Sequence, residues 1–312
     1  MQFPMTPADL DQVRVGLDAA GRAMVAIALF CMMLGVSLGL RAADFAVVLR
    51  APKLFAGGFL AQVLGLPLAT LALIAIAEPP ASIALGMIVV AACPGGNVSN
   101  ALSYFARGDV AYSVSLTAAS SAFAALLTPA AILFWSDIYP PTASLLKSID
   151  VNRGAFVIQT TSLLAVPLAL GMAVRARFDA LATRLQRPVA WTGAALLSAA
   201  IFYGVYLMFD DLLPAFAMIL PIAILHNLIA FGVGAGAGAA LRAPGPQRRS
   251  LIFEVGIQNS GLALVILVSQ FEGLGGAIAI AAVWGIWHII AGAVIVAAFR
   301  EWDRRRAMAP AH

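Results

Sequence analysis

Nine stretches of apolar residues follow one another along this 312-residue chain, and each is long enough to cross a lipid bilayer. An α-helix rises 1.5 Å per residue, so about 20 residues cover the ~30 Å hydrocarbon layer. Only 11% of the residues are charged, against roughly 25% in a soluble domain. The sequence therefore predicts an all-α polytopic membrane protein with nine transmembrane helices. The apolar segments are 23–40, 54–77, 81–105, 110–135, 155–174, 189–209, 212–241, 250–271 and 277–299.

The Lys and Arg residues indicate how the predicted bundle is oriented. Nine crossings place the two termini on opposite sides, so the basic residues can be counted separately for each side. The side of the N-terminus has only Arg14, Arg22, Lys147 and Arg153, and the other side has the remaining fifteen of nineteen. The positive-inside rule thus predicts an inner-membrane protein with an external N-terminus and a cytoplasmic C-terminus. It also accounts for the net charge of +4 without nucleic acid as a partner.

Two of the nine segments contain residues that interrupt a helix. Cys-Pro-Gly-Gly-Asn-Val-Ser-Asn at 93–100 combines a proline, which lacks a backbone donor, with two flexible glycines. Phe-Glu-Val-Gly-Ile-Gln-Asn-Ser-Gly at 253–261 follows about 160 residues later, and each interrupted segment is followed by one more segment before its half of the chain ends. Five crossings separate the two segments, so they run in opposite directions, which is typical of an inverted repeat.

The interruptions suggest how the chain is divided. A first repeat of four helices covers residues 23–135, and a second repeat of five helices covers residues 155–299. A loop at 136–154 connects them, and a basic cytoplasmic tail occupies 300–312. Residues 1–22 are expected to form an N-terminal interfacial segment.

The pattern inside that first segment predicts a helix. Thr6-Pro7 is typical of a helix start, and Leu10, Val13 and Leu17 then recur at helical spacing beside charged residues. Elsewhere, Gly232, Gly234, Gly236 and Gly238 imitate a nucleotide-binding loop. No strand precedes these glycines and they lie inside an apolar segment, so a close helix-packing face is the better interpretation.

The interrupted segments carry the groups that favour a cation site. Unwound backbone at membrane depth is tolerated where protein, water or an ion satisfies its amides and carbonyls. Glu254 is the acidic residue that falls clearly inside an apolar segment, and Gln258 follows one helical turn later. Ser113 and Thr117 are four residues apart and share one helix face. Such oxygen ligands suit sodium, whereas zinc prefers Cys or His.

Four motifs together resemble the bile acid:sodium symporter family, including bacterial homologues of the apical sodium-dependent bile acid transporter. They are Cys-Pro-Gly-Gly-Asn-Val-Ser-Asn at 93–100, Tyr-Phe-Ala-Arg-Gly-Asp at 104–109, Glu-Val-Gly-Ile-Gln-Asn-Ser-Gly at 254–261 and Trp287-His288. The resemblance implies a core domain with two crossed discontinuous helices, a separate panel domain, and sodium-coupled import of an organic anion by alternating access. The nine-span count agrees with family members that lack the first of ten spans.

The resemblance also implies which residues bind the two ions and the anion. The first sodium site would consist of Ser99, Asn100, Ser113, Thr117 and Glu254. The second would consist of Gln62, Glu254, Gln258 and the backbone carbonyls of Val255 and Ile257. The anion would lie near Asn97, Asn259 and His288. Asn97 replaces a threonine of some bacterial relatives, and Ile289 stands where the family often has asparagine, so the anion stays open.

Two sodium ions with one monovalent anion would carry a net charge of +1 inward, which makes transport electrogenic. A sodium/proton antiporter of related fold is a second hypothesis, but the segment at 81–105 offers no titrating carboxylate at the crossing. A non-transporting membrane sensor of organic anions is a third. The apolar segments lack a paired-carboxylate set or a His/Cys cluster, so no enzymatic activity is predicted. No oligomer is implied.

Overall fold

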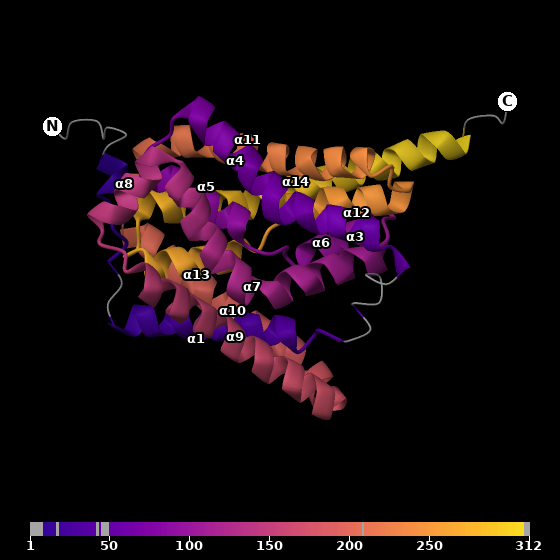
Figure 1. Cartoon of the computed structure of the whole chain (residues 1–312), viewed down its shortest axis with the longest axis horizontal. Helices are drawn as coiled ribbons and strands as arrows, with labels where there is room; N and C mark the ends of the chain where they lie inside the picture. Colours follow the sequence, from indigo (N-terminus) through magenta and orange to yellow (C-terminus); the bar gives the residue numbers. More distant parts are fainter. Residues whose placement is uncertain (1–8, 17–18, 42–43, 45–49, 208, 309–312) are drawn as a thin grey trace.

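The computed structural model describes residues 9–16, 19–41, 44, 50–207 and 209–308, and in these residues every named element is helical (Figure 1). This confirms the prediction of an all-α chain. The elements are η1 (Asp9–Asp11), α1 (Ala19–Ser37), α3 (Pro52–Leu60), the π-helical turn η3 (Ala61–Gly65), α4 (Leu66–Ala77), α5 (Ala81–Ala92), α6 (Val98–Phe105), α7 (Val110–Ile138), α8 (Pro140–Ser148), α9 (Arg153–Arg177), α10 (Asp179–Leu207), α11 (Phe209–Ala240), α12 (Gly245–Gly256), α13 (Ser260–Gln270) and α14 (Gly275–Met308).

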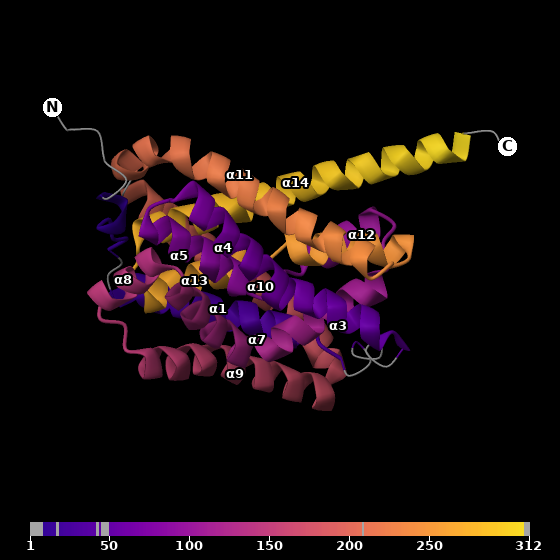
Figure 2. The same ribbon diagram turned by 45° about the horizontal axis from the view of Figure 1, so that its top comes forward.

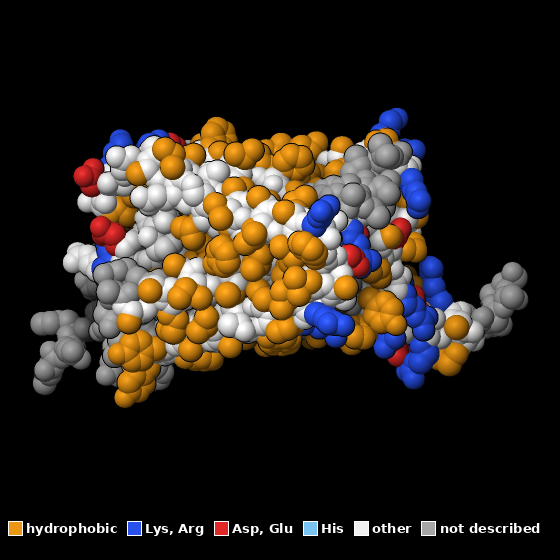
Figure 3. Space-filling view, turned by 90° about the horizontal axis from the view of Figure 1, so that it is seen from below, with side chains coloured by type: hydrophobic (Ala, Val, Ile, Leu, Met, Phe, Trp, Pro, Cys, Tyr) orange, Lys and Arg blue, Asp and Glu red, His pale blue; other side chains and the backbone are white. Residues whose placement is uncertain are grey.

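Several helices are long and apolar enough to cross a membrane. Among the described residues these are Pro52–Ala77, Val110–Ile138, Arg153–Arg177, Ala215–Ala240 and Gly275–Met308. Shorter apolar helices cover Ala23–Ser37, Ala81–Ala92 and Ser260–Gln270. Figure 3 shows apolar side chains over the middle of the body and Lys and Arg side chains gathered at the end where α14 leaves it. These features are those of a multi-pass membrane protein.

Helices α1, α9 and α10 pack against one another along one side of the molecule (Figures 1 and 2). Small residues allow this close approach, since a Cβ on Gly35 of α1 would lie 2.9 Å from the Ala190 backbone of α10. Arg175 of α9 is 7% exposed, and its guanidinium donates to the Leu38 carbonyl and the Asp179 carboxylate. The three helices thus form one packed group beside the remaining helices.

Helices α5 and α12 each end inside the molecule, and each is followed by a short link that begins with an extended residue. Residues 93–97 form the first link, and residues 257–259 form the second link. Cys93 has a ψ of 156°, as expected for a residue before proline, and α6 begins five residues later at Val98. The second link starts at Ile257, which is also extended. The two links pair through an antiparallel bridge between Gly95 and Gln258, with Gly96 N donating to Ile257 O at 3.0 Å. A second bond runs from Asn259 N to Pro94 O at 2.9 Å.

The described part of the N-terminal segment differs from the predicted helix. Between residues 9 and 16 only Asp9–Asp11 is helical, as a single 3₁₀ turn, and Ala19 already begins α1. Thr6, Pro7 and Leu17 lie outside the described residues. The carboxylate of Asp11 accepts from Ser82 N at 2.7 Å and from Ala81 N at 3.3 Å. It therefore satisfies donors at the start of α5.

The segment at 136–154, predicted as a connecting loop, contains helix α8. Tyr139 is extended, as a residue before proline should be, and Pro140 and Pro141 then occupy the first helical positions. Proline at these positions loses no hydrogen bond because the first amides of a helix have no partner within it. Asn152 then caps the next helix, α9, by accepting from Ala155 N at 3.0 Å.

Candidate functional site

The carboxylate of Glu254 lies at the centre of a group of buried oxygen atoms. Glu254 is 0% exposed and sits in the last turn of α12, directly before the second link. Ser99 of α6 donates to its Oε1 at 2.5 Å, and Thr117 of α7 donates to its Oε2 at 2.8 Å. Ser113, one turn before Thr117, also donates to Oε1. Three hydroxyls from two helices thus converge on one carboxylate.

Asn100 completes this group. Its Oδ1 accepts from Ser113 Oγ at 2.8 Å and from Thr117 Oγ1 at 3.3 Å. The structure therefore brings together all five residues that the family resemblance assigns to the first ion, from α6, α7 and α12. Asp109 helps to position this group, although it does not touch Glu254 in the hydrogen bonds described. Its carboxylate caps α7 by accepting from Tyr112 N at 3.0 Å. The cap sets where the helix that carries Ser113 and Thr117 begins.

A widened helical turn brings Gln62 to the second link. In η3 the amide of Leu66 bonds to the carbonyl of Ala61, five residues earlier, as in a π-helix. Gln62 is 2% exposed, and its Nε2 lies 3.4 Å from both Glu254 O and Gln258 Oε1. Its Oε1 has no hydrogen-bond partner among the described residues. A buried acceptor without a donor is unfavourable, which suits a cation ligand.

Gln258 lies next to Gln62 and to the backbone carbonyl of Glu254. Its Nε2 donates to Val255 O at 2.8 Å and lies 3.4 Å from Glu254 O. The carbonyl of Ile257 already accepts from Gly96 N at 3.0 Å. A Cβ on Gly95 would lie 3.0 Å from both Gln62 Nε2 and Glu254 Oε2, so a larger residue here would press on both side chains. The side chains assigned to the second ion are therefore also neighbours.

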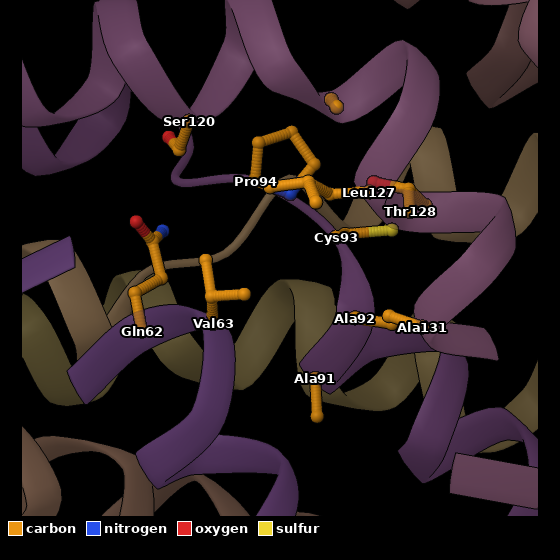
Figure 4. Close-up of a pocket in the computed structure, with 11 residues that line it drawn as sticks. Gln62, Val63, Ala91, Ala92, Cys93, Pro94, Ser120, Leu127, Thr128 and Ala131 are labelled. Atoms are coloured by element: carbon orange, nitrogen blue, oxygen red, sulfur yellow. The ribbon is translucent and has the colours of Figure 1, made fainter. Parts of the chain in front are cut away.

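A small cavity of about 20 Å³ lies beside the first link, between η3, α5 and α7 (Figure 4). It is lined by Gln62, Pro94, Ser120 and Thr128 among others, and it has room for about one water molecule. Ser120 Oγ accepts from Gly95 N at 3.3 Å. Ser120 was one of several hydroxyl residues in its apolar segment, and nothing in the sequence singled it out as the partner of the link.

The residues assigned to the anion have three different environments. Asn97 is exposed and occupies the N-cap position of α6. Asn259 is half-buried and caps α13, where its Oδ1 accepts from Leu262 N at 3.0 Å. His288 is 3% exposed, and its Nδ1 lies 3.0 Å from Trp284 O within α14. The structure places the two asparagines at the starts of α6 and α13, and no hydrogen bond joins His288 to either of them within the described part.

Sequence reasoning missed Asn227. This residue of α11 is 0% exposed, and its Nδ2 donates to the carbonyl of Gly256 at 2.8 Å. A sequence signal existed, because His226 and Asn227 form a polar pair inside a long apolar segment. His226 itself bonds to Thr70 Oγ1 at 2.8 Å, in agreement with the general expectation for a polar residue between membrane helices.

The fold and this site define a multi-pass membrane protein with a buried cluster of oxygen atoms where the end of α12 meets α6 and α7. Residues 26–213, more than half of the chain, match the Sodium Bile acid symporter family, and the chain belongs to that family. This is a family of sodium-dependent transporters rather than of enzymes.

Three relatives illustrate the range of the family. The chain is 29% identical to the uncharacterized sodium-dependent transporter YocS of Bacillus subtilis, over 87% of this chain and 81% of that one. It is 29% identical to the probable chloroplastic sodium/metabolite cotransporter BASS1 of Arabidopsis thaliana, over 88% and 66%. It is 28% identical to the sodium-dependent organic anion transporter of Rattus norvegicus, over 72% and 59%. The chain thus spans about two thirds or less of the length of the last two.

Proposed function

We propose that this chain is a sodium-coupled symporter that imports an organic anion by alternating access, with two sodium ions for each anion. The observation that carries the proposal is the fully buried Glu254 carboxylate, surrounded by hydroxyls of α6 and α7. A buried carboxylate is unfavourable without a compensating charge, and no Lys or Arg pairs with Glu254 in the described residues. A cation supplies that charge.

The first sodium ion is proposed to bind Ser99, Asn100, Ser113, Thr117 and Glu254. Each of these residues offers a hard oxygen, the ligand type that alkali and alkaline-earth cations prefer. The hydroxyls that now donate to Glu254 and Asn100 have oxygen lone pairs that can turn to an ion. The site therefore has both the charge and the ligand number that a sodium ion needs.

The second ion is proposed to bind Gln62, Glu254 and Gln258 with the carbonyls of Val255 and Ile257. The unpartnered Oε1 of Gln62 supports this assignment, because a buried amide oxygen gains a partner when a cation binds. Both proposed sites include Glu254, so one carboxylate would bind both ions.

The anion is proposed to bind near Asn97, Asn259 and His288. Asn97 and Asn259 are N-cap residues of α6 and α13, and helix N-termini offer free amides and a positive dipole end to an anion. Bound sodium would add positive charge and hold both links in one arrangement. It would thereby raise the population that binds the anion, without any direct contact between ion and anion.

Alternating access is proposed to use the two groups of helices. In this scheme α1, α9 and α10 form the panel domain, and the remaining spans form the core, with α5–α6 and α12–α13 as crossed discontinuous helices of an inverted repeat. The nine-span count, the external N-terminus and the cytoplasmic C-terminus in the inner membrane belong to the same proposal. The basic end of the body in Figure 3 supports this orientation.

The proposal is tested by thermal unfolding of the purified protein in sodium chloride and in potassium chloride, with a panel of organic anions. A ligand that binds only the folded state raises the apparent unfolding temperature. We expect stabilisation by sodium over potassium and further stabilisation by one class of anion in sodium. Equal unfolding temperatures in both salts would contradict both ion sites. Sodium-specific stabilisation without uptake of labelled anion into sealed vesicles would favour the sensor instead.

A further inference from the structure

We infer that Asn227 of α11 is a positioning residue for the second ion site, a role that rests on the function proposed above. It does not touch the proposed ion; it holds the backbone that supplies ion ligands. Its Nδ2 donates to Gly256 O at 2.8 Å, and Gly256 lies between Val255 and Ile257, whose carbonyls are the proposed ligands.

The need for such a donor follows from where the helix ends. In a continuous helix the amide of Ser260 would bond to the carbonyl of Gly256, four residues earlier. Here Ser260 N donates to Gln258 O at 2.9 Å, and Asn259 N donates to Pro94 O. The carbonyl of Gly256 has therefore lost its helical donor in the buried interior of the molecule, and Asn227 replaces that donor.

The carbonyls of Gly256 and Ile257 accept hydrogen bonds from different parts of the molecule. Gly256 O points to α11, whereas Ile257 O accepts from Gly96 N of the first link. Gly256 is the last residue of α12 and Ile257 is extended, so the chain leaves the helix between these two carbonyls. Asn227 holds the peptide group on the helix side of this change, and Gly96 holds the one on the link side.

Packing on the same face of α11 holds the Gly256 peptide close to Asn227. Phe231 lies one turn after Asn227, and a Cβ on Gly256 would overlap its ring. Asn227 is 0% exposed, and its own Oδ1 has no partner among the described residues. An apolar residue would avoid the unfavourable burial of that oxygen, so the donor at Nδ2 is the reason for an amide at this position.

The test measures the sodium concentration that gives half of the maximal thermal stabilisation, together with the unfolding temperature in potassium chloride. The variant is Asn227→Leu, which keeps the branched shape and the number of side-chain heavy atoms and removes the donor. The control is Thr160→Val on α9, a near-isosteric change at a buried hydroxyl without a hydrogen-bond partner. Outer-shell partners of metal ligands typically change metal affinity by 10- to 100-fold when removed. We expect the half-saturating sodium concentration to rise about tenfold in Asn227→Leu and to stay unchanged in Thr160→Val.

A purely structural role for Asn227 would lower the unfolding temperature equally in both salts and leave the half-saturating sodium concentration unchanged, which would overturn the inference. If Asn227→Leu does not fold, Asn227→Ser gives the same measurement, because the shorter hydroxyl cannot span the distance to Gly256 O. A wild-type protein without sodium-specific stabilisation would overturn the proposed function as well. The two failures are therefore distinguishable.

Discussion

Glu254 stands out among the acidic side chains that the structure describes, because it is fully buried with hydroxyls around it instead of a basic partner. By contrast, Asp303 at the basic end pairs with Arg249 at 2.5 Å, and Asp137 pairs with Arg153 at 2.5 Å. Those two carboxylates have a permanent counter-charge. Glu254 has only neutral donors in the described residues, so its environment suits an exchangeable cation.

Two serines on one helix give a matched test of the first ion site. Ser113 and Ser115 of α7 are 0% and 1% exposed, but Ser113 faces Glu254, whereas the hydroxyl of Ser115 bonds to the carbonyls of Asp44 and Ala111. We expect Ser113→Ala to raise the half-saturating sodium concentration at least tenfold, because it removes a proposed ligand. Ser115→Ala should leave that concentration unchanged. Thermal unfolding across a sodium series measures both, and equal behaviour of the two variants would remove Ser113 from the site.

At the scale of elements, the close contact between α11 and α12 places the Gly256 carbonyl within reach of α11. The sequence suggested that Gly232, Gly234, Gly236 and Gly238 form one packing face. In the structure, two of these glycines contact α12 and the other two do not. A Cβ on Gly234 would lie 2.8 Å from Ile252 Cα, and one on Gly238 would lie 2.8 Å from the Arg248 side chain. Gly232 and Gly236 have nothing within 4 Å. Two of the four glycines therefore allow the contact.

This difference predicts opposite effects of the same substitution. Gly234→Ala should destabilise the fold by about 1–3 kcal/mol, because the added methyl overlaps the backbone of α12. Gly236→Ala should be neutral or stabilising by up to about 1 kcal/mol, since alanine favours a helix more than glycine. Thermal unfolding in potassium chloride separates these effects from ion binding. Equal losses in both variants would contradict the packing described for α11.

The carboxylate of Asp11 in the N-terminal segment caps the start of α5. Asp11→Ala should destabilise the protein by about 1 kcal/mol, because two amides at the start of α5 lose their acceptor. Asp11→Asn keeps an acceptor oxygen and should retain most of the stability. Both are measured as shifts of the unfolding midpoint. A loss in Asp11→Asn as large as in Asp11→Ala would show that the charge, not the cap, is what matters.

Features that residues impose on their own backbone could be predicted from the sequence, whereas contacts between residues far apart in the sequence could not. Pro94 and two glycines act on their own backbone, so the end of α5 near Ala92 was readable from the residues themselves. The role of Asn227 was not readable, because its partner Gly256 is 29 residues away and is exposed as an acceptor only after α12 has ended. Asp11 acts on Ser82 across 71 residues, so its capping role was hidden while the spacing of Leu10 and Val13 predicted a helix.

At the scale of the whole molecule, the charge asymmetry and the two proposed ions lead to one functional consequence. Basic side chains gather at one end of the body, the end proposed to be cytoplasmic (Figure 3). Two sodium ions and one monovalent anion would move a net positive charge toward that end. The membrane potential then contributes roughly 2.3 kcal/mol per 100 mV for each charge that crosses the full field.

Uptake into proteoliposomes should therefore depend on voltage. With equal sodium on both sides, an inside-negative potassium diffusion potential is expected to drive accumulation of the labelled anion, and an inside-positive potential to oppose it. The control is Glu254→Ala, which should show neither effect. Uptake that is sodium-dependent but unaffected by the potential would indicate one sodium ion for each monovalent anion.

During biosynthesis the first link is made well before the second link, with which it forms hydrogen bonds. Gly96 and Pro94 find their hydrogen-bond partners in Ile257 and Asn259, which the ribosome adds about 160 residues later. At 5–20 residues per second, that interval lasts roughly 8–30 s. Until it ends, the peptide groups between α5 and α6 need water or the insertion machinery as a substitute partner. A chain truncated before residue 257 should therefore expose this link to quality control, even though its first helices are complete.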